Sequence, residues 1–281
     1  MSKDALGDRM KSLEAQETER RFLPGLPIYA RIDGRGFSKF TRDMERPFDP
    51  CMSRCMIETT KTLVTETHAT VGFVQSDEIS LVWIPGPNGI SWFDGKIMKM
   101  SSVLAGLATA SFMENVIQYF PNWMELVLRL PHFDARVISM PSETEAANML
   151  LWRNLDASKN SISMAASHYY SHRELQNKSG RDKHEMLYAK GVNWNNYPAF
   201  FKRGTFVRRT NVERTLSSLE LSAIPEKHRP PPDALVMRTE IQEFDLPPLA
   251  RIINREEVLF CGAEPKTMEQ NRDDSQKHQD L

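Results

Sequence analysis

The stretch IYARIDGRGFSKF, residues 28–40, joins a strand pattern to a carboxylate at the end of the strand. Apolar Ile28, Ala30 and Ile32 alternate with more polar residues, which is the period-two pattern of a strand with one buried face. Asp33 is then the last residue of the strand, where a turn must begin. A carboxylate at this point either forms the turn or lies at the mouth of a site.

Residues 28–140 predict the element order strand, helix, strand, strand, helix, strand. The predicted elements are a strand at 28–33, a helix from about 50 to 68, a hairpin over 71–83, a helix from about 91 to 119 and a strand at 133–140. This is the split βαβ order of the ferredoxin-like fold and of polymerase palm domains built on it. We therefore predict an α+β fold in which helices flank a palm-type antiparallel sheet, with additional C-terminal helices and strands.

We expect a single domain over residues 1–262, with a catalytic core at about 28–140 and a C-terminal elaboration over 141–262. The other expected elements are an exposed helix over 5–20, a helix opened by the capping box SETE (142–145) and continuing to about 173, a polar loop over 177–185, and strands at 204–210 and 234–240. Residues 263–281 have almost nothing to bury, which predicts a disordered tail.

The composition is that of an ordinary globular protein, with 281 residues, 40% hydrophobic and 26% charged. A formal net charge of −1 argues against wholesale non-specific binding of nucleic acid and leaves room for a local basic patch. The sequence shows no signal-peptide core and no apolar run near the ~20 residues of a membrane span, so we expect a cytoplasmic protein. His168 and His172 have the i, i+4 spacing of a zinc pair, but no third ligand is evident nearby, so we do not predict a zinc site there.

The predicted fold brings distant acidic residues to one edge of the sheet. The hairpin tip is Gln75-Ser76-Asp77-Glu78, and the first strand lies beside the second arm of the hairpin. Asp33 therefore meets Asp77 and Glu78, our candidate catalytic carboxylates. Two neighbouring carboxylates repel each other unless a cation lies between them, and hard oxygen ligands suit Mg²⁺. Taken singly, each feature also fits an ordinary turn.

Other residues around this edge are candidates for binding phosphate. The carbonyl of Gly34 is free to add a metal ligand, and the N–H groups of Arg35-Gly36-Phe37 suit triphosphate oxygens. Lys96 and Lys99 share one helix face, as a phosphate clamp or as a solvated face. Lys202, Arg203, Arg208 and Arg209 alternate with Phe200, Phe201 and Phe206, which fits either RNA binding or a strand with a solvated basic face.

Several motifs resemble those of the tRNA-His guanylyltransferase family over about residues 6–210. The matching elements are LGDRMKSLE, RIDGRGFSKF, QSDEISLVW, WFDGKIMKM, FDARV, WRNLDASKNSI, GRDKHEMLY and GVNWNNYPAFFKRGT. The family has a polymerase-like palm and extends RNA in the 3′-to-5′ direction. The resemblance implies that a nucleoside triphosphate, usually ATP, activates a tRNA 5′ end, and that the 3′-hydroxyl of GTP then attacks the activated phosphate.

The resemblance also implies the residues of the site. It implies two Mg²⁺ ions held by Asp33, the Gly34 carbonyl and Asp77. The implied nucleotide contacts are Asp33, Gly34, Arg35, Gly36, Phe37, Ser38, Ser76 and Asp77, with phosphate contacts at Arg46, Lys96, Lys99, Arg136 and Asn160. The implied partners are ATP, GTP, and tRNA-His or a 5′-truncated tRNA, and the implied assembly is a homotetramer.

One segment departs from the eukaryotic members, which carry His-Ile-Asn-Asn-Leu-Tyr-Asn where this chain has SKNSISM, residues 158–164. This pattern is typical of the guanylyltransferase-like branch, whose members favour template-directed repair of truncated tRNA 5′ ends. We therefore expect a magnesium-dependent nucleotidyltransferase that adds nucleotides, chiefly G, to a tRNA 5′ end. The alternatives are a nucleotide cyclase-like palm enzyme that acts without RNA and a non-catalytic RNA-binding module.

Overall fold

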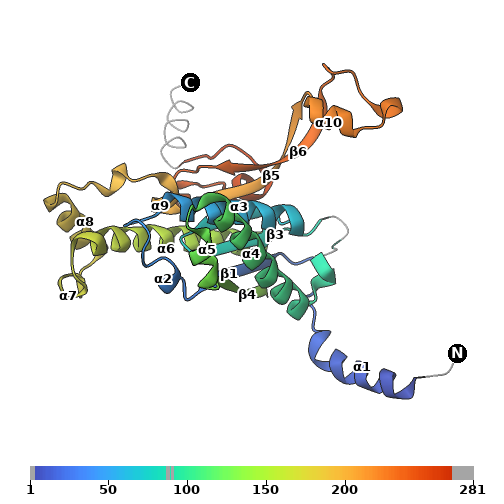
Figure 1. The fold of residues 1–281 in the computed structure, drawn as a ribbon, viewed down its shortest axis with the longest axis horizontal. Coiled ribbons are helices and arrows are strands. Elements are labelled where there is room, and N and C mark those ends of the chain that lie inside the picture. The colour runs from blue at the N-terminus through green and yellow to red at the C-terminus, as the bar shows by residue number, and fades with distance from the viewer. Residues whose placement is uncertain (1–3, 87–88, 90–91, 268–281) are drawn as a thin grey trace, which may run out of the picture.

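The computed structural model describes residues 4–86, 89 and 92–267, and it is built on one six-stranded antiparallel sheet (Figure 1). The strands are β1 (Ile28–Arg35), β2 (Val71–Gln75), β3 (Glu78–Trp83), β4 (His132–Ser139), β5 (Thr205–Arg214) and β6 (Val236–Phe244). Their order across the sheet is β4-β1-β3-β2-β5-β6. The first four strands have the ferredoxin-like order, so the predicted fold class is confirmed.

Helices cover both faces of the sheet. The α-helices are α1 (Ala5–Thr18), α2 (Phe37–Phe40), α3 (Pro50–Thr67), α4 (Ile97–Tyr119), α5 (Trp123–Leu128), α6 (Glu143–Tyr169), α7 (His172–Leu175), α8 (Gly180–Ala189), α9 (Ala199–Arg203) and α10 (Ser218–Ala223). Short 3₁₀ segments occur at Trp92–Gly95, Trp194–Asn196, Glu226–His228 and Leu249–Arg251, and a π-helical turn spans Glu257–Cys261.

The alternation of β1 divides its side chains between two hydrophobic cores. Ile28, Ala30 and Ile32 belong to the core beneath α3 and α4. Tyr29, on the opposite face, belongs to the core beneath α6, and its hydroxyl lies 2.9 Å from that of Ser80 on β3. Since Asp33 shares the face of Tyr29, its carboxylate lies on the α6 side of the sheet. The site is therefore built between the sheet and α6.

Local chemistry explains where α3 and α4 begin. The side chain of Asp49 accepts a hydrogen bond from the Met52 N–H at 3.0 Å, and Pro50 occupies the first turn of α3. The second long helix was predicted to begin near residue 91, but α4 begins at Ile97. Phe93 and Asp94 have positive φ angles of 52° and 55°, which a continuous right-handed helix does not allow.

Helix α4 is long and apolar enough to span a membrane by length and composition alone. Its packing is that of a core helix of a globular domain. Met100, Leu104, Ala108, Phe112 and Val116 are all fully buried against the sheet and neighbouring helices. This arrangement explains the high hydropathy of α4 without a bilayer.

The C-terminal half differs from prediction in three places. The helix expected to reach about residue 173 ends at Tyr169, where Tyr170 adopts an extended conformation. The expected loop over 177–185 contains α8, because Ser179 and Asp182 form a reciprocal capping box. Of the expected tail, residues 263–267 lie beside 252–254, where Ile253 N–H donates to the Lys266 carbonyl at 2.9 Å. Residues 268–281 lie outside the described residues.

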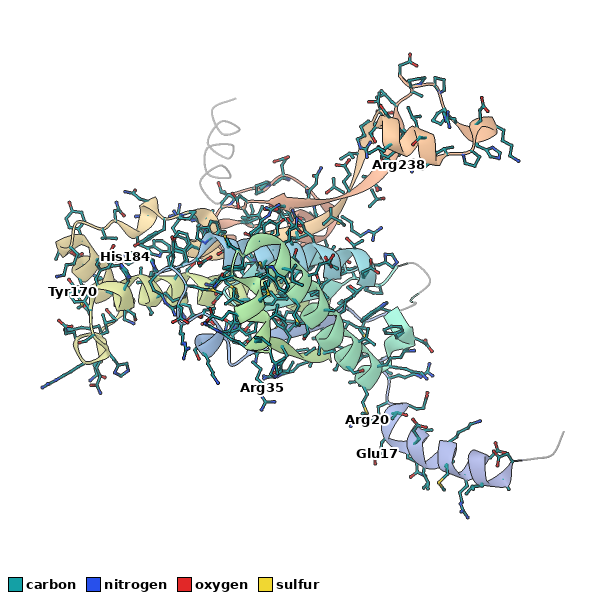
Figure 2. The ribbon with its side chains drawn as sticks, viewed as in Figure 1. Glu17, Arg20, Arg35, Tyr170, His184 and Arg238 are labelled. Carbon is teal, nitrogen blue, oxygen red and sulfur yellow. The ribbon has the colours of Figure 1, made fainter. Side chains whose placement is uncertain are left out.

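Two elements project from the body of the protein (Figure 1). Helix α1 extends away from the start of α4, and none of its residues is buried. The far ends of β5 and β6 form a two-stranded arm that carries α10, with Arg238 on the arm in Figure 2. The compact remainder contains the sheet and the three hydrophobic clusters.

Candidate functional site

The end of β1 and the β2–β3 turn meet at one edge of the sheet. Asp33 lies opposite Glu78 in the β1–β3 register, and the Gly34 N–H donates to the Asp77 carbonyl at 3.0 Å. Ser76, at the tip of the turn, has a φ of 55°. The antiparallel pairing therefore brings Asp33 and Asp77 together across 44 positions of sequence (77 − 33).

The electrostatics of this edge disfavour a charged Asp77 in the metal-free protein. Burial raises the pKa of Asp77, and the nearby charge of Asp33 raises it further, while its own backbone N–H and the Ser76 hydroxyl offset part of the effect. A cation bound between the two carboxylates would remove that cost.

Asp33 and Asp77 open onto a cavity of about 650 Å³ between the turn and α6. Most of its lining residues have polar side chains, and these residues are Asp33, Arg46, Pro47, Gln75, Ser76, Asp77, Glu78, Arg153, Asn160, Ser163, Met164, Ser167 and His168. The cavity thus combines three carboxylates with the guanidinium groups of Arg46 and Arg153. This charge pattern suits a phosphate-bearing ligand that arrives with metal ions.

A second cavity, of about 260 Å³, adjoins the first and is more apolar. The two cavities share Arg46, Pro47, Gln75, Ser76, Asp77 and Met164. The additional walls include Phe37, Phe48, Phe200 and Phe201. The Phe48 and Phe201 rings lie 4.8 Å apart between centroids. A polar cavity joined to an aromatic one suits a molecule with a charged end and a flat apolar end.

The segment from Asp33 to Ser38, which runs from the last residues of β1 through Gly36 into α2, is fixed by close packing. A Cβ atom on Gly34 would lie 2.5 Å from the Phe37 ring, so only glycine fits there without a shift. Phe37 is buried, and its ring lies 5.3 Å from Phe40, 5.3 Å from Phe112 and 5.0 Å from Phe133. Gly36 has a φ of 70° and precedes α2.

Several predicted nucleotide contacts surround these cavities. Ser38 lines the smaller cavity and Asn160 the larger one. Arg46 lines both, and its guanidinium also donates to the Thr41 carbonyl at 2.9 Å. The first N–H groups of α2, those of Phe37 and Ser38, have no acceptor within the helix.

The structure pairs Glu78 with an arginine of α6. Arg153 Nε lies 2.6 Å from Glu78 Oε1, and Arg153 Nη2 donates to Oε2 at 2.7 Å. Burial raises the pKa of Glu78, an effect that the charges of Arg153 and Arg31 oppose. Glu78, predicted as a catalytic carboxylate with Asp33 and Asp77, thus forms an ion pair with Arg153.

Helix α6 supplies site residues that sequence reasoning missed. Arg153, Ser163, Ser167 and His168 face the larger cavity beside the predicted Asn160. Their spacing is the available signal, because polar residues at helical intervals form a stripe along one face of α6. His172 begins α7 instead of extending α6, so the zinc-like spacing with His168 is not the spacing of one helix.

The donor set at the sheet edge fits Mg²⁺. Asp33, Asp77 and the Gly34 carbonyl offer hard oxygen atoms, and a magnesium site keeps several positions for water and phosphate oxygens. Within residues 4–86, 89 and 92–267 no group of three or more His, Cys, Asp or Glu side chains is arranged to hold a metal. The geometry fits an ion shared between protein and phosphate better than an all-protein cage.

Lys96 and Lys99 lie away from both cavities. Lys96 precedes α4 and its Nζ lies 2.5 Å from Glu19 beside α1, and Lys99 Nζ lies 4.6 Å from the Phe93 ring centroid. The other end of α4 carries Phe112, which packs against Phe37 next to the site. Because α4 is 23 residues long, Lys96 and Lys99 at its start lie far from Asp33 and Asp77 within one chain.

Arg35 and Arg136 also lie outside the two cavities. Arg35 ends β1 and is exposed, and Figure 2 shows its side chain reaching away from the protein body. Arg136 is exposed on the edge strand β4, 3.6 Å from Asp134. Asp134 is the register neighbour of Asp33 on β4, so it lies on the face of the sheet that carries the site.

The basic stretch after residue 200 is largely structural. Phe201 and Phe206 are buried, so they are not available to stack on RNA. Arg208 donates to the Val258 carbonyl at 2.9 Å, and Arg209 lies 2.8 Å from His68 Nδ1. The remaining predicted RNA contacts, Lys202 and Arg203, lie on α9 beside the smaller cavity, where Lys202 Nζ donates to the Asn195 carbonyl.

Comparison with known proteins identifies the fold and its relatives. Residues 7–141 match the family model described as tRNAHis guanylyltransferase. A probable tRNA(His) guanylyltransferase of Drosophila melanogaster is 29% identical over 219 residues, which cover 73% of this chain and 74% of the fly protein.

Two solved structures are also similar. A bacterial tRNA(His) guanylyltransferase-like protein in complex with ATP is 35% identical with a TM-score of 0.67, covering 73% of this chain and 88% of its own. The structure of such a bacterial protein in complex with GTP is 29% identical with a TM-score of 0.64, covering 88% and 94%. The fold of this chain is thus similar to that of proteins whose structures were solved in complex with ATP and with GTP.

Proposed function

Because this chain belongs to the tRNA(His) guanylyltransferase family of nucleotidyltransferases, we propose that it adds nucleotides, chiefly G, to the 5′ end of a tRNA. The proposed reaction depends on Mg²⁺ and runs in the 3′-to-5′ direction. In the first step the tRNA 5′-phosphate attacks the α-phosphorus of ATP and pyrophosphate leaves. In the second step the 3′-hydroxyl of GTP attacks the activated 5′-phosphorus and AMP leaves.

One observation carries the proposal. The hydrogen bond from the Gly34 N–H to the Asp77 carbonyl, 3.0 Å long, ties the end of β1 to the β2–β3 turn. It holds two carboxylates side by side at the mouth of the larger cavity. This is the arrangement that phosphoryl transfer with divalent cations requires, since such catalysis consists mainly of positioning and charge neutralisation.

The two cavities would bind different parts of the nucleotide. We assign the nucleobase to the aromatic walls of the smaller cavity, including Phe48 and Phe200, and the phosphates to the larger cavity. Arg46 and Asn160 orient phosphate oxygens, because both face that space and donate hydrogen bonds. Asp33, Asp77 and the Gly34 carbonyl would hold Mg²⁺, which when bound would offset the charge of the phosphates.

We propose that the favoured substrate is a tRNA with a truncated 5′ end. The eukaryotic His-Ile-Asn-Asn-Leu-Tyr-Asn run is replaced here by residues 158–164, and Ser163 and Met164 of this segment line the cavities. Two similar solved structures are of bacterial guanylyltransferase-like proteins, at 35% and 29% identity, and another is of the Saccharomyces cerevisiae enzyme, at 25% identity. For the tRNA backbone we propose contacts with Lys202 and Arg203, which flank the smaller cavity. A cytoplasmic homotetramer remains part of the proposal.

A transfer assay with two RNAs tests the function. The protein is incubated with MgCl₂, ATP and labelled GTP, together with intact tRNA-His or a tRNA that lacks its first nucleotide. We expect a 5′ extension by one nucleotide, with the truncated tRNA preferred. The matched controls are Asp77→Asn, which keeps the shape of the side chain, and Asp233→Asn on an exposed loop.

Three outcomes would contradict the proposal. Extension at the 3′ end would exclude the reaction direction. Cyclised GTP in the absence of RNA would favour the cyclase alternative. RNA binding without any transfer would favour a non-catalytic module. Preference for intact tRNA-His would keep the enzyme class and overturn only the truncated substrate.

A further inference from the structure

We propose that Arg153 is a positioning residue that holds Glu78 out of the metal site, so that Asp33 and Asp77 alone supply carboxylate ligands. The inference rests on the proposed function for the identity of the site. It is carried by the contacts of Arg153, a residue of α6 that the sequence motifs left without a role.

The contacts of Arg153 fix the carboxylate of Glu78 on both sides. Arg153 Nη2 donates to Oε2 at 2.7 Å, and Nε lies 2.6 Å from Oε1 as an ion-pair contact without hydrogen-bond geometry, so one guanidinium lies against both oxygens. The side chains are only 11% and 17% exposed. A planar guanidinium that meets both oxygens of a carboxylate restrains its rotation, which a single-point contact does not.

Arg153 is itself held in place. Its Nη1 lies 3.2 Å from Asp156 Oδ2, one turn further along α6, and its guanidinium carbon lies 4.8 Å from the centroid of the Trp152 ring. On the other side of Glu78, Arg31 Nε lies 3.9 Å from Oε2. Arg31 Nε and Arg153 Nε are both buried and have no hydrogen-bond acceptor within the described part of the chain, so their contacts with Glu78 are ion pairs. Glu78 therefore lies in a predominantly cationic setting beneath the cavity.

The position of Glu78 explains why such restraint matters. Glu78 follows Asp77 directly and lies opposite Asp33 in the β1–β3 register. A free carboxylate there would compete with both aspartates for a divalent cation, and it would add a third negative charge beside an incoming triphosphate. With Arg153 in place, the charge of Glu78 is balanced and its oxygens are occupied.

Arg153 also lines the larger cavity, so direct contact with phosphate is the competing role. The two roles differ in what Glu78 does when Arg153 is removed. If Arg153 positions Glu78, its loss frees a carboxylate next to the metal site. If Arg153 binds phosphate, its loss weakens the triphosphate and leaves the binding of metal alone unchanged.

The experiment compares wild type with Arg153→Gln, Arg153→Lys, Glu78→Gln and the double variant Arg153→Gln/Glu78→Gln. Mn²⁺ affinity is measured without nucleotide or RNA by titration calorimetry, followed by kcat and KM for GTP with a truncated tRNA. Arg181→Gln, on the exposed face of α8, is the matched arginine control. Melting temperatures identify variants that do not fold.

We expect Arg153→Gln to raise Mn²⁺ affinity by about tenfold or more, because it frees a carboxylate beside the metal site. The same change should lower kcat by roughly 100-fold, with a smaller effect on KM. The double variant should return Mn²⁺ affinity to within about threefold of wild type and recover at least tenfold in kcat, because the freed charge is gone. Arg153→Lys, which keeps the charge, should restore the metal affinity and only part of kcat.

A raised KM for GTP with unchanged Mn²⁺ affinity and no rescue in the double variant would overturn the inference in favour of phosphate binding. A lowered melting temperature with wild-type affinity and kcat in the folded fraction would reduce Arg153 to a structural residue. If Arg153→Gln does not fold, Arg153→Lys and the double variant still separate these roles. Because Mn²⁺ binding needs no transfer, failure of the proposed function in the wild type is distinguishable from failure here.

Discussion

The surroundings of Asp77 work against the stability of the metal-free fold. Its pKa is raised by burial and then by the charge of Asp33. A carboxyl group with a raised pKa in the folded state binds its proton more tightly there than in the unfolded chain, so its charged form is unfavourable for folding. Retaining Asp77 beside a second carboxylate at one edge of the sheet is understandable when a cation binds between them.

Asp77→Asn should separate stability from activity. The amide removes the charge and keeps the shape, so we expect the metal-free protein to gain about 1 kcal/mol at pH 7 while transfer to tRNA is lost. Thermal unfolding in chelator and the transfer assay measure the two effects. Loss of stability in the metal-free variant would contradict the electrostatic explanation.

The same raised pKa predicts a pH dependence with a defined sign. Stability from protonated Asp77 is fully present below the ordinary carboxylate pKa of about 4 and is lost as the pH rises through the raised value. The stability advantage of Asp77→Asn over wild type should therefore shrink as the pH falls from 7 toward 4. Paired unfolding curves in chelator measure this difference, in which the other carboxylates largely cancel. An advantage that does not change with pH would contradict the prediction.

Gly34 illustrates a steric requirement at the same turn. A methyl group at this position meets the Phe37 ring at 2.5 Å, and Phe37 is locked among three other phenylalanine rings. We expect Gly34→Ala to destabilise the protein by about 1–3 kcal/mol and to lower transfer activity, because the turn that carries Asp33 must move. Denaturant unfolding and the transfer assay measure both effects.

Gly106→Ala is the matched control for this substitution. Gly106 lies on the exposed side of α4 with open space around its Cβ position. Alanine there should stabilise the protein by about 0.5–1 kcal/mol, since it favours the helix. Equal effects at the two positions would show that helix propensity and packing do not distinguish them.

At the scale of elements, the arm of β5 and β6 is held at its far end by an ion-pair cluster. Arg214 lies 2.8 Å from Glu220 on α10 and 2.6 Å from Glu240 on β6. The pKa of Glu220 is lowered by Arg214 first, and then by the backbone and hydroxyl of Ser217. A lowered pKa means that this attachment persists above the ordinary carboxylate pKa and is lost only as the pH falls through the lowered value.

Glu220→Gln should loosen α10 without unfolding the protein. None of the α10 residues is buried, so the amides of 218–223 depend on local caps and the Arg214 pair. We expect faster hydrogen exchange in this segment and an unchanged global melting temperature. Glu226→Gln, on the same exposed loop region, is the control. Uniform exchange across both variants would show that the cluster does not hold the arm.

At the scale of the whole molecule, α1 contributes little to the fold of a single chain. It has no buried residue, and its link to the body includes the pair of Glu19 with Lys96. Leu6, Met10 and Leu13 are exposed on it. An isolated helix of 14 residues is marginal in water, so α1 adds exposed surface and not core.

Deletion of residues 2–17 should therefore leave the free energy of unfolding within about 0.5 kcal/mol of wild type. The deletion keeps Glu19 and its pair, and circular dichroism with thermal unfolding measures the result. A large loss of stability, with a change in mass by light scattering, would show that α1 is covered by another copy of the chain.

The sequence predicted the meeting of Asp33 and Asp77 because strand order and antiparallel pairing are enough to place them. The environment of Glu78 could not be predicted from the sequence, because it depends on how α6 packs across the sheet and on the rotamer of Arg153. The position of Lys96 required knowledge of Phe93 and Asp94, whose left-handed φ angles delay the start of α4. Ordinary spacing patterns do not reveal such φ angles.

The basic stretch after residue 200 also shows that local sequence patterns do not determine which side chains are buried. Alternation of Phe and Arg is compatible with an exposed RNA-binding strand and with a strand that buries its rings. The outcome depended on the partner of β5, because β2 and the segment after Phe244 close over Phe206. Local sequence patterns do not reveal packing partners that lie far away in the sequence.

Among the described residues, the strand order also leaves β4 with one unpaired side, where backbone N–H and C=O groups run along the border of the sheet. Such a border is a template on which a foreign strand can add, and charged side chains are a common protection against it. Asp134 and Arg136 supply this protection on β4. Replacing both with valine would remove the electrostatic barrier and make the chain prone to aggregation, with fibrils or precipitate as the visible sign.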